Sequence, residues 1–351
     1  MKRTVASMLC ACFALAGHAQ ENVPLSLKAE VRIDYQLEKV DGVTDHSHTG
    51  FDGKFLNLRL DGRITSSLSY SWRQRLNKNH QNQSFWDATD WAYIVYELGG
   101  GQWNLSAGKQ VVGIGGYEYD RAPIDLYSCS EFWNNIPCYQ MGGSVTFRSR
   151  NGRDQWMAQF CESPFQSVHP ESEMFAYNLM WMGKHGCLST LYSANMIEYA
   201  PGRFINYLAL GHRIELGNVA VELDLMNRAA DHQVFLLRDC SVMGEVAWRC
   251  SEKLQLFGKV TYDVNRTNGG DGGRVADYCV MPGTELTMYG GGLEYFPLKK
   301  NRDLRFHATC FYTTGRNGNP EGARLDKQLT GQAGVTWRLD LFALTNRLLK
   351  H

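Results

Sequence analysis

Apolar and polar residues alternate with a period of two through almost the whole chain. Across residues 25–37, apolar side chains hold every second position and polar or charged side chains hold the positions between them. Successive side chains of a β-strand point to opposite faces, so this segment has one apolar face and one polar face. The pattern recurs in segments of about ten residues as far as the C-terminus, which predicts a transmembrane β-barrel with lipid outside and a polar lumen inside.

Composition agrees with a barrel and excludes a helical membrane protein. Hydrophobic residues make up 44% of the chain, and the mean hydropathy is −0.35. No run of about 18 apolar residues is present, which excludes a transmembrane helix. A barrel sequence is this polar because every second residue faces water. Lysine and arginine number 36, equal to aspartate and glutamate, so no basic excess indicates nucleic acid as a partner.

The N-terminus has the features of a secretory signal peptide. Lys2 and Arg3 precede a mostly apolar stretch at residues 5–16, and Gly17 and Ala19 frame a small-x-small cleavage site. We therefore expect a signal peptide at residues 1–19, removed near Ala19. Residues 20–351 would then form a single barrel domain in the outer membrane of a Gram-negative-type bacterium.

Alternation and turn residues predict an all-β, antiparallel up-and-down barrel of about sixteen strands. Short connections alternate with long ones, as expected for periplasmic turns and external loops. The predicted strands span residues 25–38, 54–64, 67–76, 90–98, 102–112, 138–149, 154–162, 173–183, 187–198, 203–215, 218–228, 239–250, 253–264, 284–296, 303–314 and 328–341.

Residues 108–127, GKQVVGIGGYEYDRAPIDLY, resemble the phosphate-selective porin O and P family. In that family a Gly-Arg/Lys-Gln strand end leads into a glycine-rich, acidic segment after the fifth strand. The matching residues here are Gly108, Lys109 and Gln110 at the strand end, and Gly113, Gly115 and Gly116 behind it. The signal peptide, the strand count and the closing strand extend the resemblance over nearly all of the mature chain.

The resemblance implies an outer-membrane channel, commonly a homotrimer, whose third long loop folds inward and narrows the pore. Its partners would be outer-membrane lipid and small hydrophilic solutes or ions, anions such as phosphate among them, with no cofactor. The chain departs from the family in lacking the rich arginine and lysine lining on which phosphate selection rests. We therefore expect a general diffusion porin, without strict phosphate selectivity.

The third long connection, residues 113–137, is the predicted constriction. An acidic loop that faces a basic wall would set a transverse field across the narrowest point of the pore. The alternative is an external lid that stays outside the lumen. The predicted constriction residues are Glu118, Asp120, Arg121, Asp125 and Glu131.

The first three strands predict a basic lumen wall. Its proposed pore-lining residues are Arg32, Arg59, Arg63, Arg73 and Arg75. The alternative is that these charges pair with neighbouring carboxylates and only solvate the wall. In the later strands, the same alternation predicts that further charged residues face the lumen: Glu222, Asp224, Glu245, Arg249, Lys259, Asp263, Arg305, Arg338 and Asp340.

Two further patterns carry less weight. Asp45, His46 and His48 are metal-ligand types in the first long loop, but they lack a firm third ligand, so a solvated loop without metal is predicted. Cys129 and Cys138 share the third long loop and could form a disulfide, although separate thiols are favoured.

An enzymatic function is not predicted, and no catalytic residues are proposed. The chain has no Gly-x-Ser-x-Gly elbow and no ordered triad. A barrel enzyme of the lipase or protease type is one alternative to the porin. A plugged structural or adhesive outer-membrane barrel is the other.

Overall fold

The computed structural model describes residues 25–78, 84–230, 238–267, 275–298 and 301–342. The predicted signal peptide and its cleavage site lie outside the described residues. Within the described part, no helix is long and apolar enough to cross a membrane.

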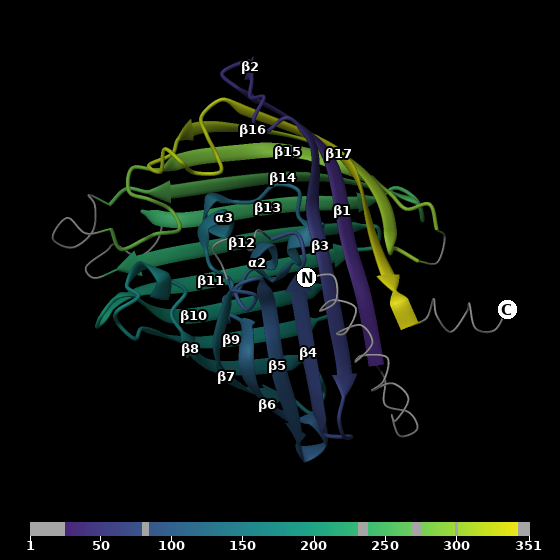
Figure 1. Ribbon diagram of the computed structural model, residues 1–351, viewed down its shortest axis with the longest axis vertical. Helices are drawn as coiled ribbons and strands as arrows, with labels where there is room; N and C mark the ends of the chain where they lie inside the picture. Colours follow the sequence, from purple (N-terminus) through teal and green to yellow (C-terminus); the bar gives the residue numbers. More distant parts are fainter. Residues whose placement is uncertain (1–24, 79–83, 231–237, 268–274, 299–300, 343–351) are drawn as a thin grey trace.

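Long antiparallel strands make up most of the described chain (Figure 1). They are β1 (Leu25–Val40), β3 (Gly50–Arg63), β4 (Leu68–Arg75), β5 (Thr89–Leu98), β6 (Trp103–Val111), β7 (Tyr139–Arg148), β8 (Asp154–Glu162), β9 (Phe175–His185), β10 (Leu188–Ala200), β11 (Arg203–Leu216), β12 (Val219–Ala230), β13 (Asp239–Arg249), β14 (Leu254–Asn265), β15 (Glu285–Tyr295), β16 (Leu304–Arg316) and β17 (Gln328–Asp340).

Short elements occupy the connections between these strands. They are the two-residue strand β2 (Val43–Thr44), the 3-10 helices η1 (Gly99–Gly101), η2 (Pro123–Asp125) and η3 (Gln166–Val168), and the short helices α2 (Tyr117–Asp120) and α3 (Glu131–Asn135). Both α-helices and η2 belong to the single connection between β6 and β7.

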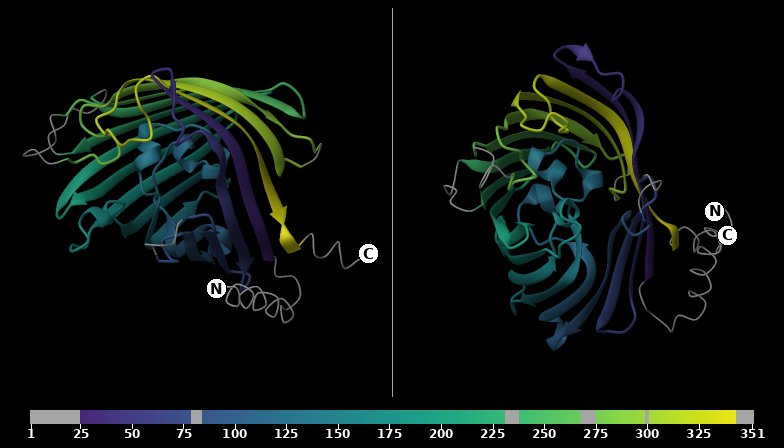
Figure 2. Two further views of the ribbon diagram at one scale, coloured as in Figure 1. Left: turned by 45° about the horizontal axis from the view of Figure 1, so that its top comes forward. Right: turned by 60° about the vertical axis from the view of Figure 1, so that its left-hand side comes forward.

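The sheet closes on itself. Each long strand pairs with its neighbours in sequence, and β1 pairs with β3 on one side and with β17 on the other, from Lys28 opposite Asp340 to Val40 opposite Gln328. All of these pairings are antiparallel. Closure leaves no sheet edge with unpaired backbone groups, which a membrane-spanning sheet requires. The two views of Figure 2 show the resulting ring of strands.

The all-β, sixteen-strand antiparallel barrel predicted from the sequence is confirmed. Every predicted strand coincides with one long strand, with ends that differ by four residues or fewer. The two-residue strand β2, which pairs with the end of β1, was not predicted. Its brevity leaves no periodic signal to detect.

The two faces of the strands differ as the alternation requires. On β1, Ile33 and Tyr35 point outward and are 41% and 45% exposed, whereas Asp34 points inward and is fully buried. Exposed outward tryptophans near the short-turn end include Trp103, Trp156 and Trp248. Membrane barrels carry such aromatic side chains where the lipid meets water.

Connection lengths distinguish the two ends of the barrel. At one end the tight turns are residues 64–67, 99–102, 149–153, 186–187, 217–218 and 250–253. At the other end the connections are mostly long, as at residues 112–138 and 163–174. The two-residue turn at 201–202, between β10 and β11, is an exception at the long-loop end. Barrels of the outer membrane place short turns in the periplasm and longer loops outside.

The interior is not polar throughout. A cluster of buried apolar side chains lies inside the ring and joins three connections to the wall. Residues 112–138 contribute Ile114, Phe132 and Ile136, and the wall contributes Ile205 and Tyr207. Phe165 and Met174 from residues 163–174, with Cys279 and Val280 from the connection after β14, complete it. This apolar packing fixes the loops against the strands β8–β12.

Candidate pore constriction

The connection between β6 and β7, residues 112–138, lies inside the barrel. In Figure 2 its helices α2 and α3 sit within the ring of strands. Its polar groups bond to side chains that point inward from β8, β10, β12, β13, β14, β16 and β17. The segment therefore crosses the lumen and contacts the wall on the far side from its own strands.

The glycine-rich start of this connection approaches the backbone of the wall closely. The Gly113 amide donates to Gln159 Oε1 at 2.6 Å, and the Gly115 amide donates to Ser193 Oγ at 2.8 Å. A Cβ atom on Gly115 would lie 2.7 Å from the carbonyl oxygen of Leu191. Glycine is needed here because any side chain would push the segment off the wall.

Helix α2 has its N-terminal cap in the barrel wall. Asp224 on β12 accepts hydrogen bonds from the amides of Tyr117 at 2.9 Å and Glu118 at 2.8 Å. Gly116, at the cap position, has φ of 100° and no side chain to serve this role. A carboxylate at a helix start satisfies free amides and interacts favourably with the helix dipole. The wall therefore replaces the missing local cap.

Helix α3 is held in the same way. Asp263 on β14 accepts hydrogen bonds from the amides of Glu131 at 2.8 Å and Phe132 at 3.4 Å. The local cap, Ser130 Oγ, accepts from the amide of Trp133 at 3.2 Å. Two inward carboxylates on different strands thus fix the positions of both helices in the lumen.

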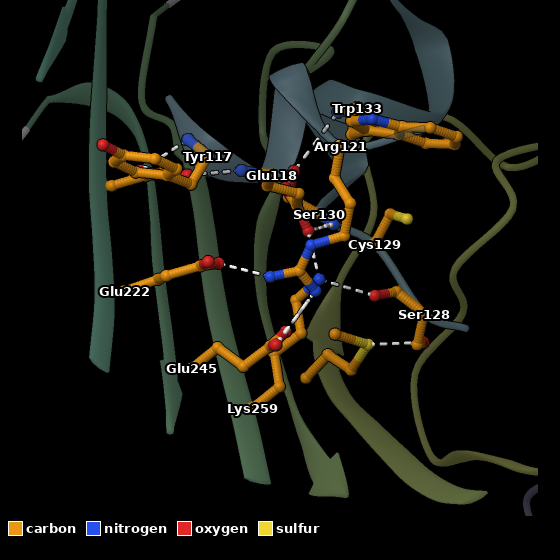
Figure 3. Close-up of polar contacts among 12 residues, drawn as sticks. Tyr117, Glu118, Arg121, Ser128, Cys129, Ser130, Trp133, Glu222, Glu245 and Lys259 are labelled. Atoms are coloured by element: carbon orange, nitrogen blue, oxygen red, sulfur yellow. Dashed lines mark hydrogen bonds and ion pairs between the residues drawn. The ribbon is translucent and has the colours of Figure 1, made fainter. Parts of the chain in front are cut away.

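Arg121, which follows α2, forms ion pairs with two strands at once. Its guanidinium contacts Glu222 on β12 and lies 2.9 Å from Glu245 Oε1 on β13. Figure 3 shows the side chain pointing between these two carboxylates. Burial acts to lower the pKa of Arg121, but Glu245 and Glu222 outweigh it and raise that pKa. The group therefore stays charged.

Helix α2 itself takes part in a buried ion pair. Lys259 Nζ on β14 is 2.6 Å from Glu118 Oε1 and also donates to the carbonyl of Ser128 at 2.8 Å. Ser130 Oγ donates to the other carboxylate oxygen of Glu118 (Figure 3). Burial acts to raise the pKa of Glu118, but Lys259 and then Ser130 outweigh it, so the pKa lies below its ordinary value.

The middle of the connection contacts the strands that close the barrel. Asp125 Oδ1 lies 2.7 Å from both Arg305 on β16 and Arg338 on β17. Burial acts to raise the pKa of Asp125, but the two guanidinium groups outweigh it and hold the pKa below its ordinary value. Arg32 on β1 adds a hydrogen bond to the carbonyl of Leu126.

The remaining two predicted constriction residues, Glu131 and Asp120, differ in their burial and in their hydrogen-bond partners. Glu131 is 1% exposed and accepts hydrogen bonds from the side-chain amides of Asn135 at 2.9 Å and Asn317 at 3.0 Å. Asp120 is exposed and forms no ion pair with any residue that the structure describes. The five residues thus share one connection. Glu131 and Asp120 both lack a basic partner among the described residues, but only Asp120 is exposed.

The predicted basic wall is paired internally. Each of the five arginines forms an ion pair with a carboxylate on its own strand, on an adjacent strand or on the strand beyond that one. The pairs are Arg32 with Asp34, Arg59 with Asp61, Arg63 with Glu97, Arg73 with Glu30 and Asp90, and Arg75 with Asp90. Arg32 and Arg73 are also buried. The geometry therefore corresponds to the alternative in which these arginines pair with carboxylates of the wall, because all five have such a partner.

A polar cavity of about 520 Å³ lies between this connection and the wall, toward the short-turn end. Arg249 and Arg302 line it, are exposed, and form no ion pair within the described part of the chain. The lining also includes Arg213, Glu222, Glu245 and Lys259. Most of the charged side chains that line the cavity are thus compensated by ion pairs, whereas Arg249 and Arg302 at its mouth are not.

One part of the site was not predicted. Tyr127 lies between the guanidinium groups of Arg32 and Arg305, at 4.6 and 5.6 Å, and its hydroxyl donates to Glu294 at 2.6 Å. His307 on β16 contacts the same ring. The alternation along β15 and β16 could have predicted that Glu294 and His307 face inward. No sequence signal gives the position of Tyr127 along the barrel axis. Cys129 and Cys138 are both free thiols, so no disulfide constrains the loop.

A closed sixteen-strand antiparallel barrel with a long connection inside its lumen defines the outer-membrane porin fold. Residues 25–186 match the family model described as phosphate-selective porin O and P, which confirms the resemblance over that part of the chain. No curated protein sequence matches the chain closely enough to be counted as a relative.

Solved structures of outer-membrane proteins share the fold over nearly their whole length. The anion-selective porin from Comamonas acidovorans superposes with a TM-score of 0.64 at 10% identity, covering 91% of this chain and 100% of that one. OmpT, an outer membrane protein of Vibrio cholerae, gives a TM-score of 0.62 at 11% identity, covering 92% and 99%. Its trimer form gives 0.60 at 11% identity, covering 91% and 100%.

Proposed function

We propose that the protein is an outer-membrane porin through which small hydrophilic solutes or ions diffuse passively. The observation that carries the proposal is the connection of residues 112–138, which crosses the lumen and is held to the opposite wall by Glu118, Arg121 and Asp125. A loop fixed by ion pairs at three positions gives a constriction of constant width. The family match over residues 25–186 supports the same function.

The mechanism needs no chemical step. A solute enters from the long-loop end, passes the constriction, and leaves through the polar cavity at the short-turn end. Size is limited by the fixed loop, and apolar solutes are disfavoured because charged walls hold water that such solutes cannot replace.

Charge selection rests on the few groups without partners. Arg249 and Arg302 at the inner mouth favour anions, phosphate among them, whereas Asp120 on the loop opposes them. Because most other charges of the connection and the wall are compensated in pairs, we propose a weak anion preference. The similarity to an anion-selective porin is consistent with this sign.

The remaining parts of the proposal concern processing and assembly. The chain would reach the outer membrane after loss of a signal peptide near Ala19, leaving residues 20–351 as one barrel domain, and would act as a homotrimer without enzymatic activity. A trimer form among the similar structures supports the assembly. Cross-linking of the purified protein in detergent tests it, since a single monomer band would contradict a trimer.

Planar-bilayer recording tests the function. The purified protein should give stable ohmic conductance steps, and a salt gradient should give a small reversal potential of the sign for anions. A strong cation preference would contradict the charge assignment. No conductance at high salt would contradict the porin itself.

One observation favours a second candidate, a plugged structural barrel. The apolar cluster that includes Phe132, Phe165 and Tyr207 fills part of the interior beside strands β8–β12. In a plugged barrel this packing would extend across the whole lumen. Liposome-swelling assays with small sugars separate the two functions, because only the porin admits the sugar.

A further inference from the structure

Three metal-ligating side chains meet at the long-loop end of the barrel, away from the constriction. They are Glu38 near the end of β1, and Asp45 and His48 in the connection to β3. One donor atom from each lies within 4.8 Å of the donors of the other two. The sequence offered Asp45 and His48 without a firm third ligand, and the fold supplies Glu38 from the strand.

Backbone pairing brings these residues together. The two-residue strand β2 folds back on β1, with Lys39 opposite Thr44, and the Asp45 amide donates to the Glu38 carbonyl at 2.9 Å. Asp45 Oδ1 accepts from the Ser47 amide at 2.9 Å, which leaves Oδ2 at 2.8 Å from His48 Nδ1. The hairpin therefore fixes the Asp45 carboxylate, and Asp45 orients the imidazole.

Glu38 carries the strongest indication of a cation site. It is 8% exposed, and it forms no ion pair with any described residue. Among the described residues, its two carboxylate oxygens accept only from neutral amides, Gln328 Nε2 at 2.8 Å and Gln36 Nε2 at 3.0 Å. Buried charges in proteins are normally paired or bound to metal. Hydrogen bonds from outer groups also orient the carboxylates that bind metals.

We propose that Glu38, Asp45 and His48 bind one divalent cation of the zinc class at the external rim. Two carboxylates and an imidazole are ligands that Zn²⁺ accepts in a four-coordinate site, with water in the remaining position. Calcium and magnesium prefer all-oxygen sites, so the imidazole selects against them. The bound ion compensates Glu38 and ties the connection of residues 41–49 to β1. The proposal does not depend on conduction.

Zinc titration of the full-length, untagged protein in detergent micelles tests the site. The protein is first stripped with chelator, and its accessible thiols are alkylated because free cysteines also bind zinc. Calorimetry should give one Zn²⁺ per chain. H48N should weaken binding about 10-fold or more, and Gln328→Leu, which removes an orienting amide, should weaken it about 10-fold.

The neighbouring histidine gives a matched control. His46 lies in the same connection but is not one of the three converging residues, so H46N should bind Zn²⁺ as the wild type does. Cobalt provides a second readout, since bound Co²⁺ should show the visible bands of nitrogen and oxygen ligands, and H48N should lose them. Absence of stoichiometric binding, equal loss in H46N, unchanged affinity in H48N, or tighter binding of Ca²⁺ than Zn²⁺ would each overturn the proposal.

Discussion

Two walls of the lumen use their charges differently. On β3–β5, arginines pair with carboxylates of the wall itself, as in Arg59 with Asp61 and Arg63 with Glu97. On β12–β17, charged side chains reach residues 112–138 instead, as in Lys259 with Glu118 and Arg338 with Asp125. In the first arrangement the charged side chains pair along the surface of the wall. In the second they fix the position of a connection inside the lumen. Charge content alone therefore does not indicate which wall positions the constriction.

The largest difference between the walls is expected in stability. Lys259→Met leaves Glu118 buried without a counter-charge and should destabilise the barrel by about 3–5 kcal/mol. Arg63→Met removes a partly exposed pair and should cost under about 1 kcal/mol. Unfolding by denaturant in micelles, followed by tryptophan fluorescence, measures both. Equal costs would contradict the assignment of the two walls.

A steric substitution should displace the loop without changing any charge. A Cβ atom at Gly211 on β11 would lie 2.8 Å from the Cα of Gly116, so Gly211→Val must push α2 away from the wall. We expect a loss of about 1–3 kcal/mol, as for overpacked cores, and altered channel conductance. Gly258→Ala is the matched control, because its nearest atom is 3.8 Å away. An unchanged conductance in Gly211→Val would argue against the close contact.

Acid should release the loop. The ordinary pKa values of Glu118 and Asp125 are 4.5 and 3.8, and both are lowered in the folded protein. A carboxyl group with a lowered pKa stabilises the fold above its ordinary pKa, and this stabilisation is lost as the pH falls through the folded value. The contribution of Glu118 and Asp125 to holding the loop should therefore persist down to about pH 5, and channel noise from its loss should rise below about pH 4. Noise that rises between pH 8 and 6 would implicate other groups.

The smallest expected effect concerns selectivity. Arg249→Gln combined with Arg302→Gln removes two unpaired charges at the inner mouth and should abolish the proposed weak anion preference. Screening lengths are about 10 Å at 0.1 M salt and about 3 Å at 1 M, so the change should be visible only in dilute salt. Reversal potentials measure it. A change of the same size at 1 M salt would place these charges at the constriction itself.

The sequence predicted the strands well because alternation is a local signal. It also predicted the inward parity of residues such as Asp224 and Asp263. It could not predict their role as caps of α2 and α3, since that depends on the height at which the connection crosses the lumen. The pairing of Arg73 with Glu30 and Asp90 was equally hidden, because the partners lie on other strands and depend on register. By contrast, Arg59 and Asp61 share one face of one strand, so their pairing was visible.

Single-channel recording of Asp125→Asn tests most directly whether the β12–β17 wall positions the constriction. The substitution removes the ion pairs that Arg305 and Arg338 make with the connection, although each arginine keeps a wall carboxylate, Glu294 or Glu30, and it frees the middle of the connection. Asp61→Asn, which unpairs Arg59 on the other wall, is the control. We predict flickering current with added conductance levels for Asp125→Asn, and a steady current with stronger anion preference for Asp61→Asn. A steady, wild-type trace for Asp125→Asn would contradict the account.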